Sequence, residues 1–442
     1  MPGGLLTDMY ELNMAASYLR HGMTDQATFS LFARRLPAGR GFLVAAGLED
    51  ALDFLESFAL EPEDLAYLRE VQGYDAETLR ALAGLRFTGE VWAVPEGRAV
   101  FAGEPLLEVT APIAEAQLVE TVLLNHLTFQ TSVASKAARC VLAADGARLI
   151  DFAFRRTQGI EAGVAVARAT AIAGFAATSN AEGARRHGLP ASGTMAHSYV
   201  QAFPDEEAAF AAFAADFPDR TTFLVDTYDT VAGVRTAAEV ARRLELAGSA
   251  VGVRLDSGDL ADLAVRARRL LDAAGLRQAV IVASGGLDEY AIADLVRAGA
   301  PIDAYGVGTR VGVSADAPSL DTAYKLVAYG DRPVMKLSPG KMTLPGAKQV
   351  FRGPRSDVIA LREEAPPPGW RPLLVPVVVA GHRVAPPERI GVMRDRCMSE
   401  LARLPAPVRV LRAPGTVPVE ISPRLRRLQD DLVRTLRGRG PA

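Results

Sequence analysis

Apolar and polar residues alternate along the chain in a way that divides it into three regions. In residues 1–140, the segments 48–58 and 62–71 have the apolar spacing of amphipathic helices, and 116–143 reads as one long helix. Residues 89–112 break into short alternating runs punctuated by Gly and Pro, which predicts a small antiparallel sheet. We therefore expect an N-terminal α/β domain over 1–140.

The middle region, 141–330, has a different rhythm. Short β-branched or apolar runs alternate with alanine-rich helical stretches such as 163–175 and 258–275, a pattern typical of parallel βα units. Seven candidate strands are 147–153, 176–179, 191–195, 221–226, 249–255, 279–284 and 302–308. Seven such units predict a closed or nearly closed α/β barrel, and a doubly wound open sheet is the alternative on pattern alone.

The last region, 331–442, is rich in Pro and Gly. Residues 363–372 have the composition of a loop, and the apolar run 373–381 follows them. The stretch from 422 to the end predicts a basic amphipathic helix with a frayed tail, which we interpret as a solvated helix face. We expect this C-terminal region to pack partly on the N-terminal domain.

Composition excludes several classes of protein. Among 442 residues, 49% are apolar and 23% charged, and the formal net charge of −3 favours neither nucleic acid nor a membrane surface as a partner. Cys140 and Cys397 lie far apart, so neither a zinc site nor a disulfide framework is indicated, and we expect a reducing, cytoplasmic location. The first residues lack the features of a signal peptide, and no uncharged apolar run is long enough to span a bilayer.

Polar residues follow nearly every candidate strand. Catalytic groups of a parallel α/β barrel sit at the carboxyl ends of its strands, and a purely structural barrel does not need polar residues at all of them. The segments to inspect are 151–156, 177–180, 192–198, 225–229, 253–259, 283–286 and 305–310. They predict a functional site at this end of the sheet.

Two glycine clusters suit a phosphate group. Gly285 and Gly286 form one cluster, and Gly306, Gly308 and Thr309 form the other, late in the predicted barrel. Backbone N–H groups at such points cradle anions, and phosphate sites after the last strands recur in barrel folds. The alternative is that these glycines only make tight turns. No GxGxxG motif occurs, so a Rossmann dinucleotide site is not supported.

Three further residues carry candidate chemistry. Arg254 and Asp256 are two apart, so on a strand they point the same way and can hold an acidic substrate and a sugar hydroxyl together. The alternative is a structural ion pair, with Ser257 or Asp259 capping the next helix; we assign Asp259 mainly to that cap. His197 lies in a polar, glycine-bearing strand end, which favours a functional role over a structural one. The other histidines lack such a context and are interpreted as structural or surface residues.

Seven motifs, taken together and in order, resemble the nicotinate phosphoribosyltransferase family. They are LLTDMYELNM (5–14), FSLFARRLPAGRGFLVAAGL (29–48), DFAFRRTQG (151–159), SGTMAHS (192–198), VRLDSGDL (253–260), GVGT (306–309) and YKLV (324–327). The resemblance runs from about residue 5 to 352. It implies an N-terminal α/β sandwich domain packed on an irregular seven-stranded α/β barrel, a C-terminal extension, and a homodimer whose sites are completed across the interface.

The resemblance also implies an activity. Members join nicotinate to 5-phosphoribosyl 1-diphosphate, releasing nicotinate mononucleotide and diphosphate, and hydrolyse ATP with Mg²⁺ through a phosphohistidine. This is a ligase or glycosyltransferase reaction of NAD biosynthesis (salvage). The expected nicotinate-binding residues are Tyr10 (from the partner subunit), Phe152, Arg155, Thr194 and Arg254. Asp256 would bind ribose hydroxyls, and His197 would be phosphorylated. The expected phosphate-binding residues are Arg34, Gly285, Gly286, Gly308, Thr309, Lys325 and Lys336.

Several alternatives remain. Ser179 aligns with an aspartate of the nicotinamide-using relative, so serine favours nicotinate over nicotinamide. Quinolinate phosphoribosyltransferase is a less favoured relative, because it is shorter and needs several cationic groups to hold the two carboxylates of its substrate. The Rossmann-like class of phosphoribosyltransferases binds ribose hydroxyls through a loop with two adjacent acidic residues. Asp226 and Asp229 are three apart, so we do not assign this chain to that class. A non-catalytic barrel that binds pyridine nucleotides is disfavoured by the intact His197, Arg254 and Asp256. A Schiff-base aldolase is disfavoured because no strand end of the middle region carries a lysine.

Overall fold

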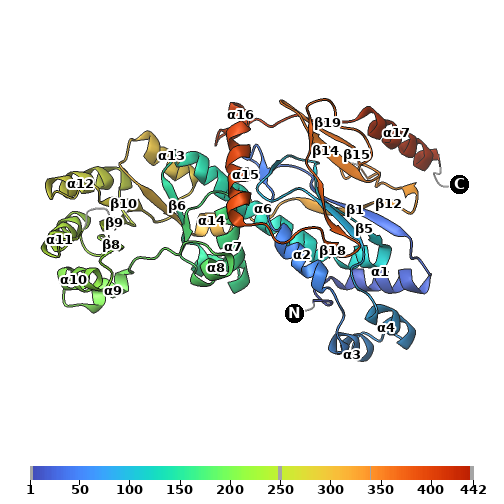
Figure 1. Ribbon diagram of the computed structural model, residues 1–442, viewed down its shortest axis with the longest axis horizontal. Coiled ribbons are helices and arrows are strands. Elements are labelled where there is room, and N and C mark those ends of the chain that lie inside the picture. The colour runs from blue at the N-terminus through green and yellow to red at the C-terminus, as the bar shows by residue number, and fades with distance from the viewer. Residues whose placement is uncertain (1–2, 247–250, 339, 439–442) are drawn as a thin grey trace. The chain divides into compact units, whose positions relative to one another are not determined.

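The chain forms two compact units along its length. The structure, a computed structural model, describes residues 3–246, 251–338 and 340–438. One unit comprises Met1–Ser132 with Ser319–Ala442, and the other comprises Val133–Pro318. Figure 1 traces the order of the elements. The sequence places domain boundaries at 140/141 and 330/331, and the C-terminal residues group with the N-terminal ones.

The first unit is built on a seven-stranded antiparallel sheet with the order β13-β12-β1-β5-β3-β17-β18. In that order the strands are Arg332–Pro333, Thr322–Tyr329, Gln26–Ala33, Pro105–Pro112, Glu90–Ala93, Val375–Val379 and His382–Arg383. The predicted pairing within 89–112 is confirmed, because β3 and β5 are antiparallel neighbours. The middle run, β4 (Ala99–Val100), instead pairs with β2 (Leu43–Val44) in a separate ribbon.

A smaller four-stranded sheet completes the strands of this unit. Its order is β16 (Arg371–Pro372), β14 (Lys348–Arg352), β15 (Asp357–Leu361) and β19 (Val419–Ile421). The apolar run 373–381 contains β17, which belongs to the seven-stranded sheet, and it follows the segment 363–372 that the sequence predicts to be a loop. The sandwich arrangement of the N-terminal domain stays a prediction.

The helices of this unit follow the amphipathic segments of the sequence. They are α1 (Met9–Arg20), α2 (Leu48–Ser57), α3 (Pro62–Glu70), α4 (Ala76–Ala83), α5 (Ile113–Leu118), α6 (Glu120–Ala143, whose end belongs to the second unit), α15 (Ile390–Arg403), α16 (Ala406–Arg409) and α17 (Pro423–Gly438). The helices predicted at 48–58 and 62–71 are confirmed as α2 and α3, and the long one at 116–143 is split between α5 and α6. In α17 only Leu425 is buried, and the predicted tail at 439–442 lies outside the described residues.

The second unit contains a six-stranded parallel sheet. Its order is β7 (Ala177–Thr178), β6 (Arg148–Asp151), β11 (Ala304–Val307), β10 (Val280–Ala283), β9 (Val251–Leu255) and β8 (Thr221–Leu224). These are six of the seven predicted strands. Residues 249 and 250 of the predicted fifth strand lie outside the described residues.

The segment 191–195 does not form the predicted seventh strand. It contributes an isolated parallel bridge between Ala191 and Thr178, and Ser192 N donates to Thr178 O at 2.9 Å. Beyond Ser192 the chain continues through Gly193 and enters a helix at His197, so too few residues stay extended for a ladder. The result is a parallel α/β sheet open on this side, and closure into a seven-stranded barrel is not confirmed.

Helices alternate with these strands, as the βα pattern predicts. They are η1 (Phe154–Arg156), α7 (Ile160–Ile172), α8 (Ala181–His187), α9 (His197–Ala202), α10 (Glu206–Asp216), α11 (Thr230–Arg243), α12 (Leu260–Ala273), α13 (Glu289–Arg297) and α14 (Thr309–Gly312). Helices α10 to α12 lie on the outer side of β8 to β10 (Figure 1). Asp259 caps α12 by accepting from Ala261 N and Asp262 N at 3.1 and 3.2 Å, so the predicted cap is confirmed.

None of the helices in the described residues is long and apolar enough to cross a membrane.

Candidate functional site

A cavity of about 560 Å³ opens where the strands of the second unit end. Its described lining includes three arginines and one aspartate, so the lining carries net positive charge. The lining residues are Phe152, Phe154, Arg155, Arg156, Ser179, Gly193, Thr194, Met195, Ala196, His197, Arg254, Asp256, Ser284, Gly285, Gly286, Gly306, Gly308 and Thr309. Every site residue that the sequence predicts within this unit is on that list. His197, Arg254 and Asp256 therefore share one cavity.

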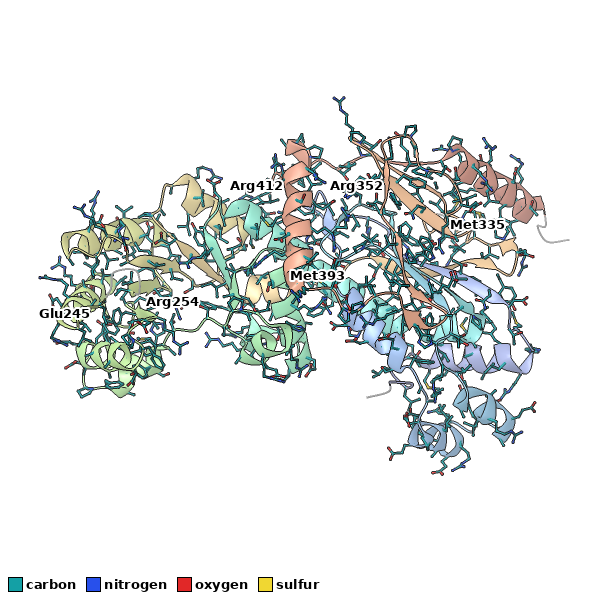
Figure 2. The ribbon with its side chains drawn as sticks, viewed as in Figure 1. Glu245, Arg254, Met335, Arg352, Met393 and Arg412 are labelled. Carbon is teal, nitrogen blue, oxygen red and sulfur yellow. The ribbon has the colours of Figure 1, made fainter. Side chains whose placement is uncertain are left out.

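Arg254, labelled in Figure 2, lies on β9, and its side chain is only 15% exposed. Its Nη1 donates to Thr194 Oγ1 at 2.7 Å, its Nη2 lies 3.5 Å from Asp256 Oδ1, and the guanidinium carbon lies 5.8 Å from the Phe152 ring centroid. Burial lowers the pKa of Arg254, although two nearby carboxylates oppose this, and a guanidinium stays charged in proteins. Its buried Nε has no hydrogen-bond partner within the described residues. A fixed cation with an unused donor suits an anionic ligand.

Asp256 follows β9 directly and is oriented by two neighbouring strand ends. Its Oδ1 accepts a short hydrogen bond from Ser284 Oγ, just after β10. Its backbone N donates to Asp226 Oδ2 at 3.3 Å, and Ser257 Oγ donates to the same oxygen at 2.5 Å. Asp226, just after β8, thus fixes the turn that carries Asp256. The sequence marks the segments of Ser284 and Asp226 as polar strand ends but assigns neither residue a role.

His197 is the first residue of α9, and its ring lies against the loop that follows β8. His197 Nδ1 is 3.2 Å from Thr227 Oγ1. Since Nδ1 is engaged, Nε2 is the ring nitrogen without a hydrogen-bond partner in the described part of the chain. Thr227 is a second residue of the 225–229 segment that the sequence did not single out.

Two glycines are required by the close packing of this site. Gly285 has φ +94°, and a Cβ there would lie 1.9 Å from Asp256 O, so only glycine lets the β10 turn approach the end of β9. A Cβ on Gly306 would lie 2.4 Å from two ring atoms of Phe152. Gly285 therefore does make a tight turn, as the structural alternative proposes. It also places Ser284 and Gly286 at the cavity.

The other predicted residues fall into two groups. Arg155, in η1, and Ser179, just after β7, are exposed and line the cavity. Tyr10, Arg34, Lys325 and Lys336 belong to the other compact unit.

Within that unit, the predicted basic residues differ in how they are held. Arg34 Nη1 pairs with Asp321 Oδ1 at 2.9 Å. Lys325 Nζ donates to Tyr324 O at 2.7 Å and lies 3.8 Å from Glu120 Oε1. Lys336 is exposed.

Tyr10, on α1, is 47% exposed. Burial, together with the charges of Glu120 and Glu11, raises the pKa of its hydroxyl, which therefore stays protonated at neutral pH.

No group of three or more His, Cys, Asp or Glu side chains that could hold a metal ion occurs in the described ranges. Asp256 is the acidic residue that lines the cavity. Mg²⁺ commonly binds through one or two carboxylates together with substrate phosphates and water, and this donor set fits that mode.

Two family descriptions match the chain. Residues 5–128 match the nicotinate phosphoribosyltransferase (NAPRTase) N-terminal domain, and residues 147–331 match the nicotinate phosphoribosyltransferase (NAPRTase) family. A nicotinate phosphoribosyltransferase of Mycobacterium tuberculosis is 48% identical over 430 residues, covering 96% of this chain and 92% of the relative. That of Bacillus subtilis is 44% identical over 356 residues, covering 79% and 72%.

A solved structure agrees with these matches. The crystal structure of human nicotinic acid phosphoribosyltransferase superimposes with a TM-score of 0.85 at 31% identity, covering 96% of this chain and 99% of the human one. A nicotinate-nucleotide pyrophosphorylase from Pyrococcus furiosus gives a TM-score of 0.75 at 26% identity, covering 90% and 95%. With its cavity residues, its fold and its sequence all in accord, the chain belongs to the nicotinate phosphoribosyltransferase family.

Proposed function

We propose that this protein is a nicotinate phosphoribosyltransferase, which forms nicotinate mononucleotide and diphosphate from nicotinate and 5-phosphoribosyl 1-diphosphate. The observation that carries the proposal is the single cavity shared by His197, Arg254 and Asp256, beside the glycine turns after β10 and β11. The names of the relatives support the same reaction. We also propose that the segment 191–195, which bridges to β7 through Ala191 without forming a regular strand, takes the seventh position of an irregular barrel.

The acceptor half of the site is suited to a flat, anionic ring. The carboxylate of nicotinate would form an ion pair with the guanidinium of Arg254, which Thr194 holds in place. The pyridine ring would lie against Phe152 and near Arg155, with Tyr10 covering it from a partner subunit. Ser179 brings no negative charge to the lining, so a carboxylate is favoured over the amide of nicotinamide.

The donor half is suited to a phosphorylated sugar. Asp256 has one oxygen engaged by Ser284, which leaves the other for ribose hydroxyls. Backbone N–H groups at Gly285, Gly286, Gly308 and Thr309 would cradle the 5-phosphate. When bound, Mg²⁺ would neutralise charge on the diphosphate, held by diphosphate oxygens, water and Asp256.

The reaction needs positioning more than proton transfer. The bond from the ribose C1 to the diphosphate oxygen breaks, and the lone pair of the pyridine nitrogen forms the new bond to C1. Positive charge that develops on the sugar ring is stabilised by Asp256, and the negative charge of the leaving diphosphate is stabilised by nearby cations. Arg34, Lys325 and Lys336 are proposed for the diphosphate and for the phosphates of ATP.

We further propose that ATP phosphorylates His197 and so couples its hydrolysis to product formation, in a cytoplasmic homodimer that serves NAD biosynthesis. Nε2 of His197 is the nitrogen that would accept the phosphoryl group, because Nδ1 faces Thr227. Transfer breaks the bond from the γ-phosphorus to the bridging oxygen of ATP and releases ADP, and water later removes the phosphoryl group.

The test of the activity uses the purified protein with nicotinate, 5-phosphoribosyl 1-diphosphate and Mg²⁺, with and without ATP. Chromatography follows nicotinate mononucleotide, and we expect product that increases with ATP. A parallel reaction with nicotinamide as the acceptor distinguishes the amide-using alternative. Absence of product in both reactions, with ligands still bound, would leave a non-catalytic pyridine-nucleotide-binding protein.

The histidine role has a separate test. We expect His197→Ala to keep nicotinate binding while ATP hydrolysis no longer increases product formation, and His21→Ala, at an exposed position, to behave as the wild type. Phosphate on the wild-type chain after incubation with ATP, absent from His197→Ala, would support the assignment. Unchanged stimulation by ATP in His197→Ala would reject it.

A further inference from the structure

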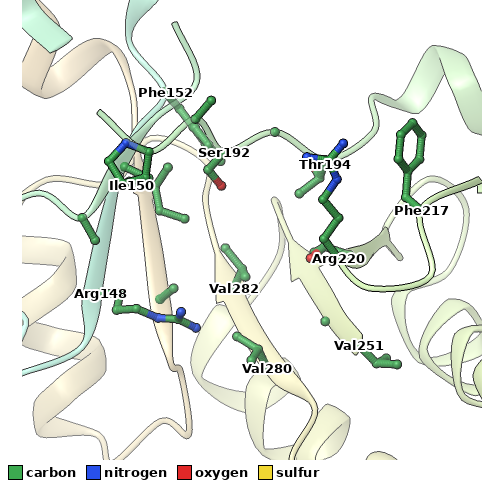
Figure 3. A pocket seen from close by; sticks show the side chains of 18 of the residues that line it. Arg148, Ile150, Phe152, Ser192, Thr194, Phe217, Arg220, Val251, Val280 and Val282 are labelled. Atoms are coloured by element: carbon green, nitrogen blue, oxygen red, sulfur yellow. The ribbon is translucent and has the colours of Figure 1, made fainter. Parts of the chain in front are cut away.

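A second and larger cavity lies against one face of the parallel sheet of the second unit. It measures about 700 Å³ and is lined mostly by apolar residues of the strand starts and of the loops beside them (Figure 3). Phe152, Gly193 and Thr194 line this cavity as well as the candidate active site. The two cavities therefore meet at these three residues, and the second one extends toward the amino ends of the strands.

The cavity exists because the inward positions of several strands are small. Side chains alternate along a strand, so Arg148 and Ile150 of β6 face the same side, and Phe152 continues the row. Interiors of parallel barrels are usually filled by layers of bulky branched side chains. Here Ala177, Gly252 and Ala304 line the interior instead and leave it unfilled.

Two arginines, both exposed, line this mostly apolar cavity. In Figure 3 the Arg148 side chain extends from β6 toward Val280, and Arg220 lies on the opposite side, beside Phe217. The carbon of the Arg220 guanidinium is 5.3 Å from the Phe217 ring centroid. Neither arginine has an acidic partner within the described ranges. Among the lining residues that the structure describes, Asp219 is the one carboxylate, and it adjoins Arg220 in sequence, which leaves Arg148 as the stronger anion anchor.

From this arrangement we infer that the cavity is a binding site for a flat organic monoanion, an aromatic or heteroaromatic carboxylate, distinct from the site of the proposed reaction. The ring lies against Ile150, Val280 and Val282, and the carboxylate pairs with Arg148. Pockets of a few hundred cubic ångströms, mostly apolar with a few polar groups, are typical of small-molecule sites, and an arginine pairs with a carboxylate through two parallel N–H donors. Binding here does not depend on the proposed activity.

The test measures binding of 2-naphthoate to the full-length protein by isothermal titration calorimetry, with nicotinate mononucleotide in excess to occupy the site of the proposed reaction. We expect one bound equivalent, with Arg148→Gln weakening the affinity about tenfold, equivalent to about 1.4 kcal/mol. Arg220→Gln should weaken it less. Arg235→Gln, an exposed arginine on α11, is the matched control and should bind as the wild type. Arg254→Gln should also keep the affinity, because that residue belongs to the other cavity.

Two further measurements separate charge from space. The neutral 2-naphthol should bind equally to the wild type and Arg148→Gln, and Val280→Phe, which fills the cavity, should abolish binding of both compounds. If Val280→Phe does not fold, the affinities of the arginine variants for 2-naphthoate still test the inference. Affinity lost in Arg254→Gln, affinity unaffected by Arg148→Gln, or no binding below about 1 mM would each overturn the inference.

Discussion

Replacing Gly306 by alanine tests whether the Phe152 ring forms the floor of the base pocket. A Cβ at position 306 would lie 2.4 Å from two ring atoms of Phe152, whereas ordinary contacts begin at 3.4 Å. The ring must therefore retreat by about 1 Å, since both partners sit on paired neighbouring segments of the sheet. Overpacking of this kind costs about 1–3 kcal/mol, and misplacement of a substrate-positioning group by about 1 Å costs on the order of 100-fold in rate.

The assay for Gly306→Ala combines thermal unfolding with steady-state kinetics. We expect Tm to fall by about 2–4 °C per kcal/mol, and kcat/KM for nicotinate to fall roughly 10- to 100-fold, with a smaller effect on the phosphoribosyl donor. Phe152→Leu in the Gly306→Ala background should restore Tm, because the shorter side chain relieves the clash, but not the affinity for nicotinate. Wild-type Tm and kinetics in Gly306→Ala would refute the reasoning.

The other predictions concern the polar network and the pH dependence of stability. Ser284→Ala removes a hydrogen bond to the Asp256 carboxylate, so kcat/KM for the phosphoribosyl donor should fall about tenfold with nicotinate binding unchanged; Thr170→Ala, a buried hydroxyl away from the cavity, is its control. Burial and two nearby carboxylates raise the pKa of Glu206 to about 7 from its ordinary value of 4.5. The neutral carboxyl of Glu206 contributes to the free energy of unfolding in full below pH 4.5, and this contribution is lost as the pH rises through 7. We therefore expect Tm to fall less between pH 5 and 8 in Glu206→Gln than in the wild type. The exposed Glu239→Gln is the control and should show the same fall as the wild type. A parallel pH profile in Glu206→Gln and the wild type would contradict this assignment.

Sequence patterns predicted the parts of this fold that depend on local chemistry. Apolar runs located the strands of the second unit, and Asp259 marked the start of α12, because capping and periodicity act over a few residues. The gathering of polar residues at one cavity also followed from local sequence, since the carboxyl ends of parallel strands meet at one edge of a sheet.

What the sequence could not predict depends on contacts between distant segments. Asp256 bonds to Ser284, 28 residues further on, and this pairing depends on the register between β9 and β10. His197 meets Thr227, 30 residues further on, for a similar reason. The segment 191–195 looks like a strand by composition, but ladder formation depends on neighbours that periodicity does not describe. The hollow interior was likewise not foreseen, because it arises from small residues on several strands at once.

The central claim is that the fixed charge of Arg254 selects the carboxylate of the acceptor. The most direct measurement is the ratio of kcat/KM for nicotinate to that for nicotinamide, in the wild type and in Arg254→Gln. Truncating one partner of a buried charge pair costs about 2–5 kcal/mol, so we predict that Arg254→Gln lowers kcat/KM for nicotinate by roughly 30-fold or more while changing that for nicotinamide only a few-fold. An unchanged ratio, with both acceptors affected equally or not at all, would contradict the account.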